Sequence, residues 1–166
     1  MLFSTKAEYG VRLMVELGRR MGDQDPAETA PVSLTSVAEA EGLPLSYLEH
    51  LVAKLRGAGL VSSVRGAHGG YRLARAPEEI TMIEVVQALE GPIAPMECFR
   101  PDGEGRVLCS HEADGDRSCA TKLLWMRVQG GVTRALAGTS LAELVEFADM
   151  QQGTGTGTPL TVQPAA

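Results

Sequence analysis

The sequence has few cysteines and few aromatic residues, and it has no long apolar run. Only three cysteines occur among its 166 residues, which excludes a disulfide-stabilised scaffold. No stretch approaches the roughly 18 consecutive apolar residues of a membrane-spanning helix, and the first ten residues lack the basic flank and apolar stretch of a signal peptide. We therefore expect a cytoplasmic protein whose thiols stay reduced.

Apolar residues are still numerous enough to form a core. They make up 44% of the chain, and charged residues make up 22%, which is typical of one folded domain with an extension. The chain lacks a Walker loop, an HExxH helix and a GxSxG turn, so we expect a binding protein and not an enzyme. The net charge of −6 argues against a surface that is basic throughout, but it allows a local basic patch.

Several helices can be placed from apolar residues at helical spacing and from residues that begin or end helices. The expected helices span about residues 6–21, 35–41, 46–58, 81–89, 119–137 and 140–149. Four of them begin with the capping-box pattern S/T-x-x-E, formed by Thr5 and Glu8, Ser46 and Glu49, Thr81 and Glu84, and Ser140 and Glu143. The chain is therefore predicted to be mainly α-helical.

A glycine-rich hairpin is predicted between the third and fourth helices. Residues 60–64 and 71–73 are β-prone, and three glycines between them favour a turn. Two short helices followed by a hairpin are the elements of a winged helix-turn-helix, whose second short helix enters the major groove of DNA. The predicted fold class is therefore mainly α with a small β-hairpin wing: a winged helix-turn-helix DNA-binding domain followed by a long dimerisation helix.

Basic residues are concentrated on the third helix and the hairpin. Residues 53–75 include five basic and no acidic side chains, whereas residues 1–85 as a whole carry nine basic and eleven acidic ones. This distribution favours contact with DNA phosphates, and an ordinary solvated face is the alternative. The predicted DNA-binding residues are Ser46, Tyr47, Glu49, Lys54, Arg56, Arg65, His68 and Arg72.

Two of these residues have a specific expected role. Glu49 could accept a hydrogen bond from the amino group of cytosine, or it could simply close the capping box with Ser46. Arg65 at the hairpin turn could enter a minor groove, or it could stay in solvent.

The three cysteines lie in an irregular segment that is rich in proline, glycine and acidic residues. Cys98, Cys109 and Cys119 are separated by ten and nine residues, which is not the close pairing of a zinc ribbon. The segment offers few apolar residues to bury them. From spacing alone, a soft metal centre, thiol redox chemistry and a structural role all stay open.

Three stretches of the sequence resemble one family of regulators. They are STKAEYGVRLM at the start, LSYLEHLVAKLRGAGLVSSVRGAHGGYRLA in the DNA-binding region, and ECF followed by two further cysteines ending in CATKLLW. On these stretches, residues 1–150 resemble the IscR/NsrR/RirA family of winged-helix regulators that bind iron–sulfur clusters. The resemblance implies a homodimer with paired long helices and a two-iron or four-iron cluster near the interface. It also implies that Cys98, Cys109 and Cys119 are cluster ligands.

The chain departs from this family in two places. Its cysteine segment is longer than the family's usual loop, and Lys122 stands where IscR-like members have a histidine, which leaves the fourth ligand open. Glu8 matches a first-helix position from which some NsrR-like members supply a carboxylate across the dimer, although it could instead cap its own helix. His111, water and a small thiol are other candidates, whereas His68 is expected to lie too far away on the wing.

The overall prediction is a homodimeric regulator that binds double-stranded operator DNA. It would sense iron, redox or nitric-oxide status through an iron–sulfur cluster and control cluster assembly, iron or stress genes. The rival hypotheses are a cluster-free thiol switch and a zinc-stabilised interaction domain that does not bind DNA.

Four regions are expected along the chain. They are the DNA-binding domain (1–90, with its first helix near the dimer interface), the cluster-binding loop (91–118), the dimerisation and C-terminal helices (119–150) and a disordered tail (151–166). The apolar stripe expected at the dimer interface consists of Leu124, Val128 and Val132.

Overall fold

The computed structural model describes residues 3–94 and 121–154, with side chains described up to residue 151. Its two strands form one antiparallel hairpin, and the other elements are helical. The elements are α1 (Thr5–Met21), α2 (Leu34–Glu41), α3 (Leu45–Gly57), β1 (Val61–Val64), β2 (Gly70–Leu73), the short 3-10 helix η1 (Pro77–Glu79), α4 (Met82–Glu90), α5 (Thr121–Ala137) and α6 (Leu141–Thr154). The predicted mainly helical fold with a small hairpin is confirmed.

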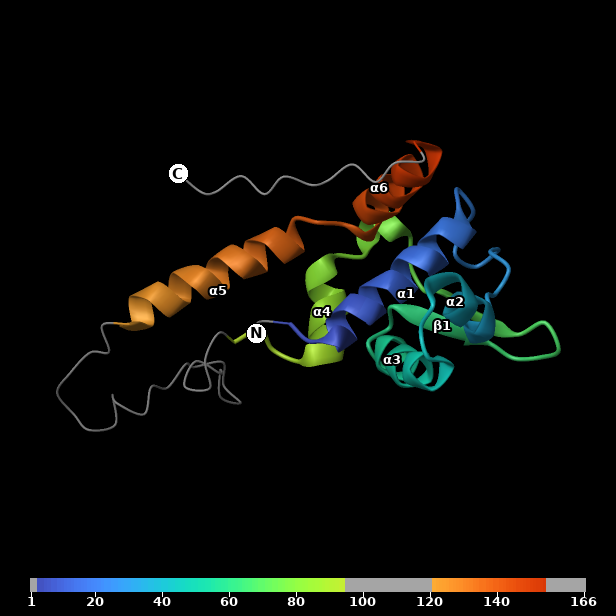
Figure 1. The fold of residues 1–166 in the computed structure, drawn as a ribbon, viewed down its shortest axis with the longest axis horizontal. Helices are drawn as coiled ribbons and strands as arrows, with labels where there is room; N and C mark the ends of the chain where they lie inside the picture. The colour runs from blue at the N-terminus through green and yellow to red at the C-terminus, as the bar shows by residue number, and fades with distance from the viewer. Residues whose placement is uncertain (1–2, 95–120, 155–166) are drawn as a thin grey trace.

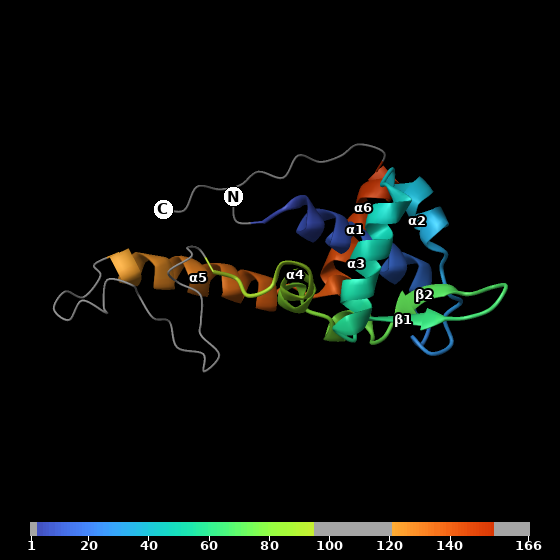
Figure 2. The same cartoon turned by 90° about the horizontal axis from the view of Figure 1, so that it is seen from below.

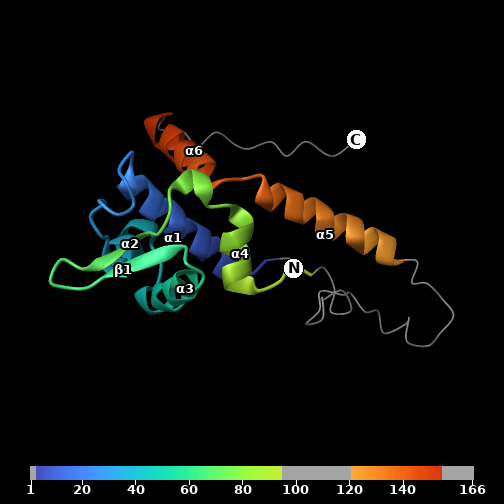
Figure 3. The same ribbon diagram turned by 180° about the vertical axis from the view of Figure 1, so that it is seen from behind.

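Helix α1 is the centre of the molecule. It lies between α6 on one side and α3 on the other, with α4 alongside (Figures 1 and 3). Its residues Leu13, Met14 and Leu17 are almost completely buried in the core. The core is continued by apolar residues of α2, α3, the hairpin and α4, so that one hydrophobic core holds all of these elements together.

The hairpin is anchored to the segment before α2 by an isolated β-bridge. Val61 pairs with Leu73 at its base and Val64 pairs with Gly70 near its tip. Tyr71 of β2 also exchanges two backbone hydrogen bonds of 2.8 Å with Val32, which precedes α2. Strand β2 is therefore fixed to the start of the helix-turn-helix, while the turn before Gly70 projects beyond it (Figure 2).

Helices α5 and α6 behave differently although they are consecutive. Helix α5 projects from the body at the end opposite the wing (Figures 1 and 2). Helix α6 returns to α1 and buries Leu141 completely, and the backbone amide of Leu141 donates to Ile80 at 2.8 Å. It therefore shares the core of the DNA-binding domain, whereas the sequence predicts a region that α6 forms together with the long helix. Within the part of the chain that the structure describes, no helix is long and apolar enough to span a lipid bilayer.

Two of the four expected capping boxes are confirmed. Thr81 and Glu84 cap α4, with the Thr81 amide donating to the Glu84 carboxylate at 2.9 Å. Ser140 and Glu143 cap α6 in the same way, with reciprocal bonds of 2.6 and 3.2 Å. The two capped helix starts lie side by side, because Thr81 and Ser140 form an isolated antiparallel bridge.

The other two expected boxes are wrong, because α1 begins one residue earlier than its box requires and α3 begins two residues earlier. The N-cap of α1 is Ser4, whose Oγ accepts from the Lys6 amide at 3.2 Å. The N-cap of α3 is Pro44, and none of the described side chains caps that helix. Glu8 therefore lies within the first turn of α1 and Glu49 lies beyond the first turn of α3, and neither caps its helix.

Several helix ends differ slightly from expectation. Helix α2 begins at Leu34, capped by Ser33, and α4 continues to Glu90. Helix α6 continues to Thr154, past the expected start of the tail at 151, whereas residues 155–166 lie outside the described residues. Weak apolar periodicity near helix ends accounts for such differences, since capping and tertiary contacts decide the last turn.

Helices α1 and α4 approach each other closely at Gly10 of α1. Gly10 is buried against the side chain of Leu89, the penultimate residue of α4. A β-carbon at Gly10 would overlap Leu89, which is itself only 1% exposed and has no open space to move into. The absence of a side chain at Gly10 therefore lets α4 lie against α1.

We expect Gly10→Ala to lower the free energy of unfolding, measured by urea denaturation, by about 1–3 kcal/mol because it overpacks this contact. Gly57→Ala is the matched control, since Gly57 is helical and has open space where a β-carbon would lie. That control should gain up to about 1 kcal/mol from helix propensity alone. Equal stabilities of the two variants would contradict the tight contact.

Candidate nucleic-acid interface and sensor site

Helix α3 has one buried and one exposed face, as a recognition helix requires. Its buried residues are Leu48, Leu51, Val52 and Leu55. Ser46, Glu49 and His50 are exposed and lie on the opposite face at spacings of three and four residues. His50 is not among the DNA-binding residues predicted from the sequence, although its spacing of four from Ser46 places it on the same stripe.

Tyr47 lies differently from the other predicted residues of α3. Its side chain is half-buried against the core, and its ring meets the ring of Tyr9 edge to face, with centroids 5.8 Å apart and planes at 89°. Aromatic pairs of this geometry stabilise packing. Tyr47 therefore helps to seat α3 on α1.

The basic residues of the DNA-facing region divide into two groups. Three are bound within the protein: Lys54 donates to the Leu89 carbonyl at 3.0 Å, Arg72 donates to the Ala27 carbonyl, and Arg75 pairs with Glu84 at 2.7 Å. The remaining cations, together with a neighbouring histidine, are exposed, and their side chains have no hydrogen bond or ion pair within the described chain; they are Arg56, Arg65 and His68. The second group can contact phosphates without breaking an existing interaction.

The wing presents Arg65 and His68 around a turn that depends on glycine. Gly66 has φ of 126°, a backbone conformation that side chains strongly disfavour. A β-carbon on Gly69 would collide with the carbonyl of Val64. The turn is therefore compact and carries its cationic residues at the projecting end of the hairpin (Figure 2).

Helix α2, the first helix of the helix-turn-helix, is held to α1 at both ends. Arg12 binds Glu41 through its side chain at 2.8 Å and through the main chain at 2.7 Å. Arg20 donates to Ser36 at 2.7 Å and pairs with Glu16, a carboxylate that is only 6% exposed. These contacts fix α2, and through it the turn that leads into α3.

The last residue of α4 is held at the start of α1 by hydrogen bonds. The carboxylate of Glu90 accepts from the Ser4 amide at 3.0 Å and from the Ser4 hydroxyl. Partial burial opposes ionisation of Glu90, but these hydrogen bonds outweigh it and lower the pKa of Glu90 below its ordinary value. Glu90 therefore remains ionised beside the N-terminus of α1.

The sensor residues are only partly within the described chain. Cys98, Cys109, Cys119 and His111 lie outside the described residues. Glu8 is exposed on the first turn of α1, and its carboxylate has no hydrogen bond or ion pair with any described residue. In residues 3–94 and 121–154, no group of three or more potential ligands is placed to hold a metal ion.

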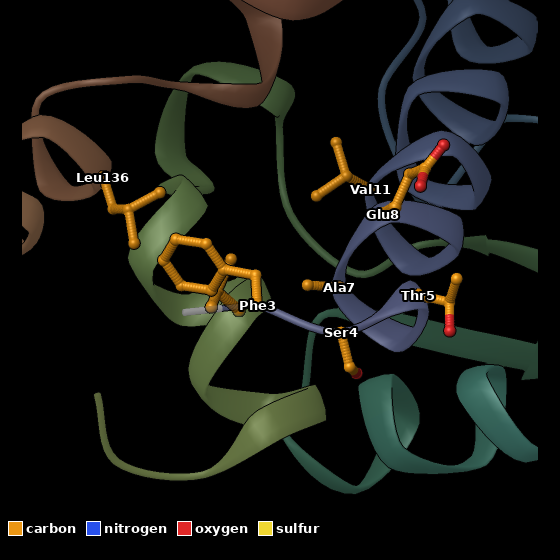
Figure 4. Close-up of a pocket in the computed structure, with 8 residues that line it drawn as sticks. Phe3, Ser4, Thr5, Ala7, Glu8, Val11 and Leu136 are labelled. Atoms are coloured by element: carbon orange, nitrogen blue, oxygen red, sulfur yellow. The ribbon is translucent and has the colours of Figure 1, made fainter. Parts of the chain in front are cut away.

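Glu8 borders an apolar cavity of about 410 Å³. Ala7, Glu8 and Val11 of α1 form one side, and Phe3 and Leu136 form the other (Figure 4). Its remaining lining comes from Ser4, Thr5 and Val86. The carboxylate therefore lies at the rim of an open apolar surface next to α5.

Helix α5 exposes several large apolar side chains. None of its residues is buried within the described structure. Leu124 is 55% exposed, while Val128 and Val132 are half-buried. Leu123 and Met126, outside the predicted stripe, are also more than half exposed. Exposed apolar clusters of this kind mark interaction surfaces.

A fixed helix-turn-helix, an exposed face on α3 and a cationic wing define a winged-helix DNA-binding protein. Comparison with known proteins is consistent with this class. The profile of the Rrf2 family, described as iron-dependent transcriptional regulators, matches residues 3–147. The chain belongs to the Rrf2 family, a family of transcriptional regulators and not of enzymes.

Two curated relatives illustrate the range of the family. The chain is 38% identical over 152 residues to the HTH-type transcriptional regulator CymR of Bacillus subtilis, covering 92% of this chain and 95% of that protein. It is 35% identical over 152 residues to the HTH-type transcriptional regulator IscR of Aliivibrio salmonicida, covering 92% and 82%.

Two solved structures also match this fold. CymR, described as the global cysteine regulator of B. subtilis, has a TM-score of 0.68 and 37% identity, covering 89% of this chain and 98% of that one. IscR of T. potens has a TM-score of 0.68 and 35% identity, covering 92% and 91%. The predicted family and fold are thereby confirmed.

We expect Arg65→Ala to weaken DNA binding and to reduce the slope of log affinity against log salt concentration by about 0.9, the effect of one lost phosphate contact. Fluorescence anisotropy over a series of salt concentrations measures both. Arg72→Ala is the control, because its guanidinium is bound to Ala27, and it should mainly loosen the hairpin. An unchanged slope for Arg65→Ala would place Arg65 in solvent.

Proposed function

We propose that this regulator is a homodimer that senses iron, redox or nitric-oxide status through an iron–sulfur cluster and controls cluster-assembly, iron or stress genes. The observation that carries the proposal is the match to a family described as iron-dependent, in a chain with three cysteines in one segment. Cysteine thiolates are the usual ligands of iron–sulfur clusters. Cys98, Cys109 and Cys119 would hold the cluster, which supplies the redox-sensitive centre when bound.

Glu8 is the proposed fourth ligand, supplied by the partner subunit. Two observations support it: its carboxylate is exposed, and it is not used to cap α1, since Ser4 has that role. Lys122 interacts with another residue and is a poor ligand while protonated. A carboxylate ligand would make the cluster easier to lose, which suits a sensor.

The homodimer is proposed from the apolar surface of α5. The stripe Leu124, Val128 and Val132 lies on a helix that projects from the body (Figure 1). A second copy would bury this stripe, and two-fold symmetry would place the two recognition helices on a two-fold operator. In this arrangement residues 1–90 bind DNA, 91–118 bind the cluster, and α5 joins the subunits.

A cluster-free thiol regulator is the second candidate. It is favoured by the likeness to CymR, whose solved structure is described as that of a global cysteine regulator. In that case the same three cysteines would act through oxidation. A zinc-stabilised domain without DNA binding is disfavoured by membership of a family of transcriptional regulators.

The cluster is tested by anaerobic purification with iron and sulfide analysis and visible spectroscopy. We expect a brown wild-type protein and loss of the cluster in single Cys→Ala variants at positions 98, 109 and 119, with the fold retained by circular dichroism. A colourless wild-type protein that changes DNA affinity on thiol oxidation would favour the second candidate. Full cluster occupancy in one variant would remove that cysteine from the ligand set.

Glu8→Gln extends the same experiment to the fourth ligand. Because Ser4 caps α1, this substitution should leave the helix intact while removing the charged ligand. A changed spectrum and faster cluster loss are expected. The native spectrum and lifetime in Glu8→Gln would assign the fourth position to His111, solvent or a small thiol.

Val128→Asp tests the dimer. A carboxylate in the apolar stripe should be too costly to bury, so the variant should sediment as a monomer and bind a two-fold operator weakly. Arg127→Asp is a matched control on an exposed position of the same helix. A dimeric Val128→Asp protein would move the interface elsewhere.

A further inference from the structure

The last turn of α4 contacts both α1 and α3 immediately before the cysteine segment. Leu89 and Glu90 end this helix, and the chain continues from there toward Cys98. The Leu89 side chain is packed against Gly10 of α1, while its carbonyl accepts from Lys54 of α3. Two residues therefore link the start of the cysteine segment to the central helix and to the recognition helix.

The contact between Lys54 and Leu89 satisfies a general requirement of helix ends. The last carbonyls of a helix have no partner within it and carry partial negative charge. The Lys54 ammonium lies 3.0 Å from one of them and so stabilises the C-terminal end of α4. Its position shows that this charge is directed toward α4 within the protein.

Glu90 makes the complementary contact with α1. The N-terminus of a helix carries partial positive charge and unpaired amides, and the Glu90 carboxylate accepts from the amide and hydroxyl of Ser4 at that end. The last turn of α4 is thus contacted by the ammonium group of Lys54 from α3, and its own carboxylate, that of Glu90, contacts the start of α1. Both contacts depend on the position of this turn.

We propose that Lys54 and Glu90 are positioning residues that, with the last turn of α4, form a joint between the cysteine segment and α3. Through this joint the state of the cysteine segment changes the position of α3 on DNA. The proposal rests on the proposed function, since it takes the cysteine segment as the sensor. A displacement of residue 91 would first move the last turn of α4, which directly precedes it. Leu89 is close-packed on Gly10, so this turn cannot shift alone. A shift either moves α3 through Lys54 or breaks the hydrogen bond from Lys54 to the Leu89 carbonyl.

The test measures DNA affinity of full-length Lys54→Met in the cluster-loaded and cluster-free states. The probe is a double-stranded oligonucleotide selected from a random pool by the wild-type protein. In the wild type, the two affinities should differ by about 5–150-fold, the usual range of coupling between sites. In Lys54→Met their ratio should fall to within about twofold of one, while the salt slope stays unchanged because no phosphate contact is lost.

Arg56→Met is the matched control on the same helix. Arg56 is exposed, and its guanidinium has no partner in the described chain. This variant should lose about 0.9 from the salt slope and keep the wild-type ratio of affinities. The same loss of slope in Lys54→Met, or a retained ratio there, would overturn the proposal and make Lys54 a phosphate contact or a bystander.

Glu90→Gln provides a second route to the answer should Lys54→Met not fold. The amide keeps an acceptor for Ser4 but removes the charge at the start of α1, so the ratio of affinities should again fall. A folded Glu90→Gln protein that keeps the wild-type ratio of DNA affinities between the two states would overturn the proposal. If the wild type itself shows no difference between the two states, the proposed sensing function fails, and the joint fails with it.

Discussion

The fold depends on the close packing of α4 and α6 against α1, which two glycines make possible. Gly10 lies under Leu89 of α4, and a β-carbon at Gly18 would come within 2.7 Å of Val145 of α6. Gly10 and Gly18 are eight residues apart, so they lie near one face of α1 about two turns from each other. Any larger residue at these positions would push α4 or α6 away from α1, and the contacts that hold α3 would then be broken. The orientation of the recognition helix is therefore set from the centre of the molecule outward.

Charge is used in two distinct ways around this centre. Arg12, Arg20 and Lys54 fix helices by donating to side chains or to main-chain carbonyls, and Glu90 accepts at the start of α1. Arg56 and Arg65 are exposed, and their guanidinium groups have no partner among the residues that the structure describes. Added salt weakens solvent-exposed contacts with phosphate far more than part-buried bonds to carbonyls. A change of salt can therefore reveal which of the two uses a given cation has.

The sequence was sufficient for the class of fold because its signals are local. The stripe of α3, the glycines of the hairpin and the box of Thr81 and Glu84 each depend on neighbouring residues. The misplaced starts of α1 and α3 have another cause: Ser4 is held by the distant Glu90, and Pro44 begins α3 by its fixed φ without a side-chain cap. No local pattern could show that Lys54 reaches Leu89, since that contact joins two helices.

The distribution of acidic residues explains how a chain with net charge −6 can bind DNA. Helix α6 carries Glu143, Glu146 and Asp149 and no basic residue up to its end at Thr154. It lies on the opposite side of α1 from α3 (Figure 3). DNA that approaches α6 is repelled, while DNA that approaches the α3 side meets Arg56 and the cationic wing. The molecule is thus polarised, and this asymmetry orients its encounter with DNA before any base is read.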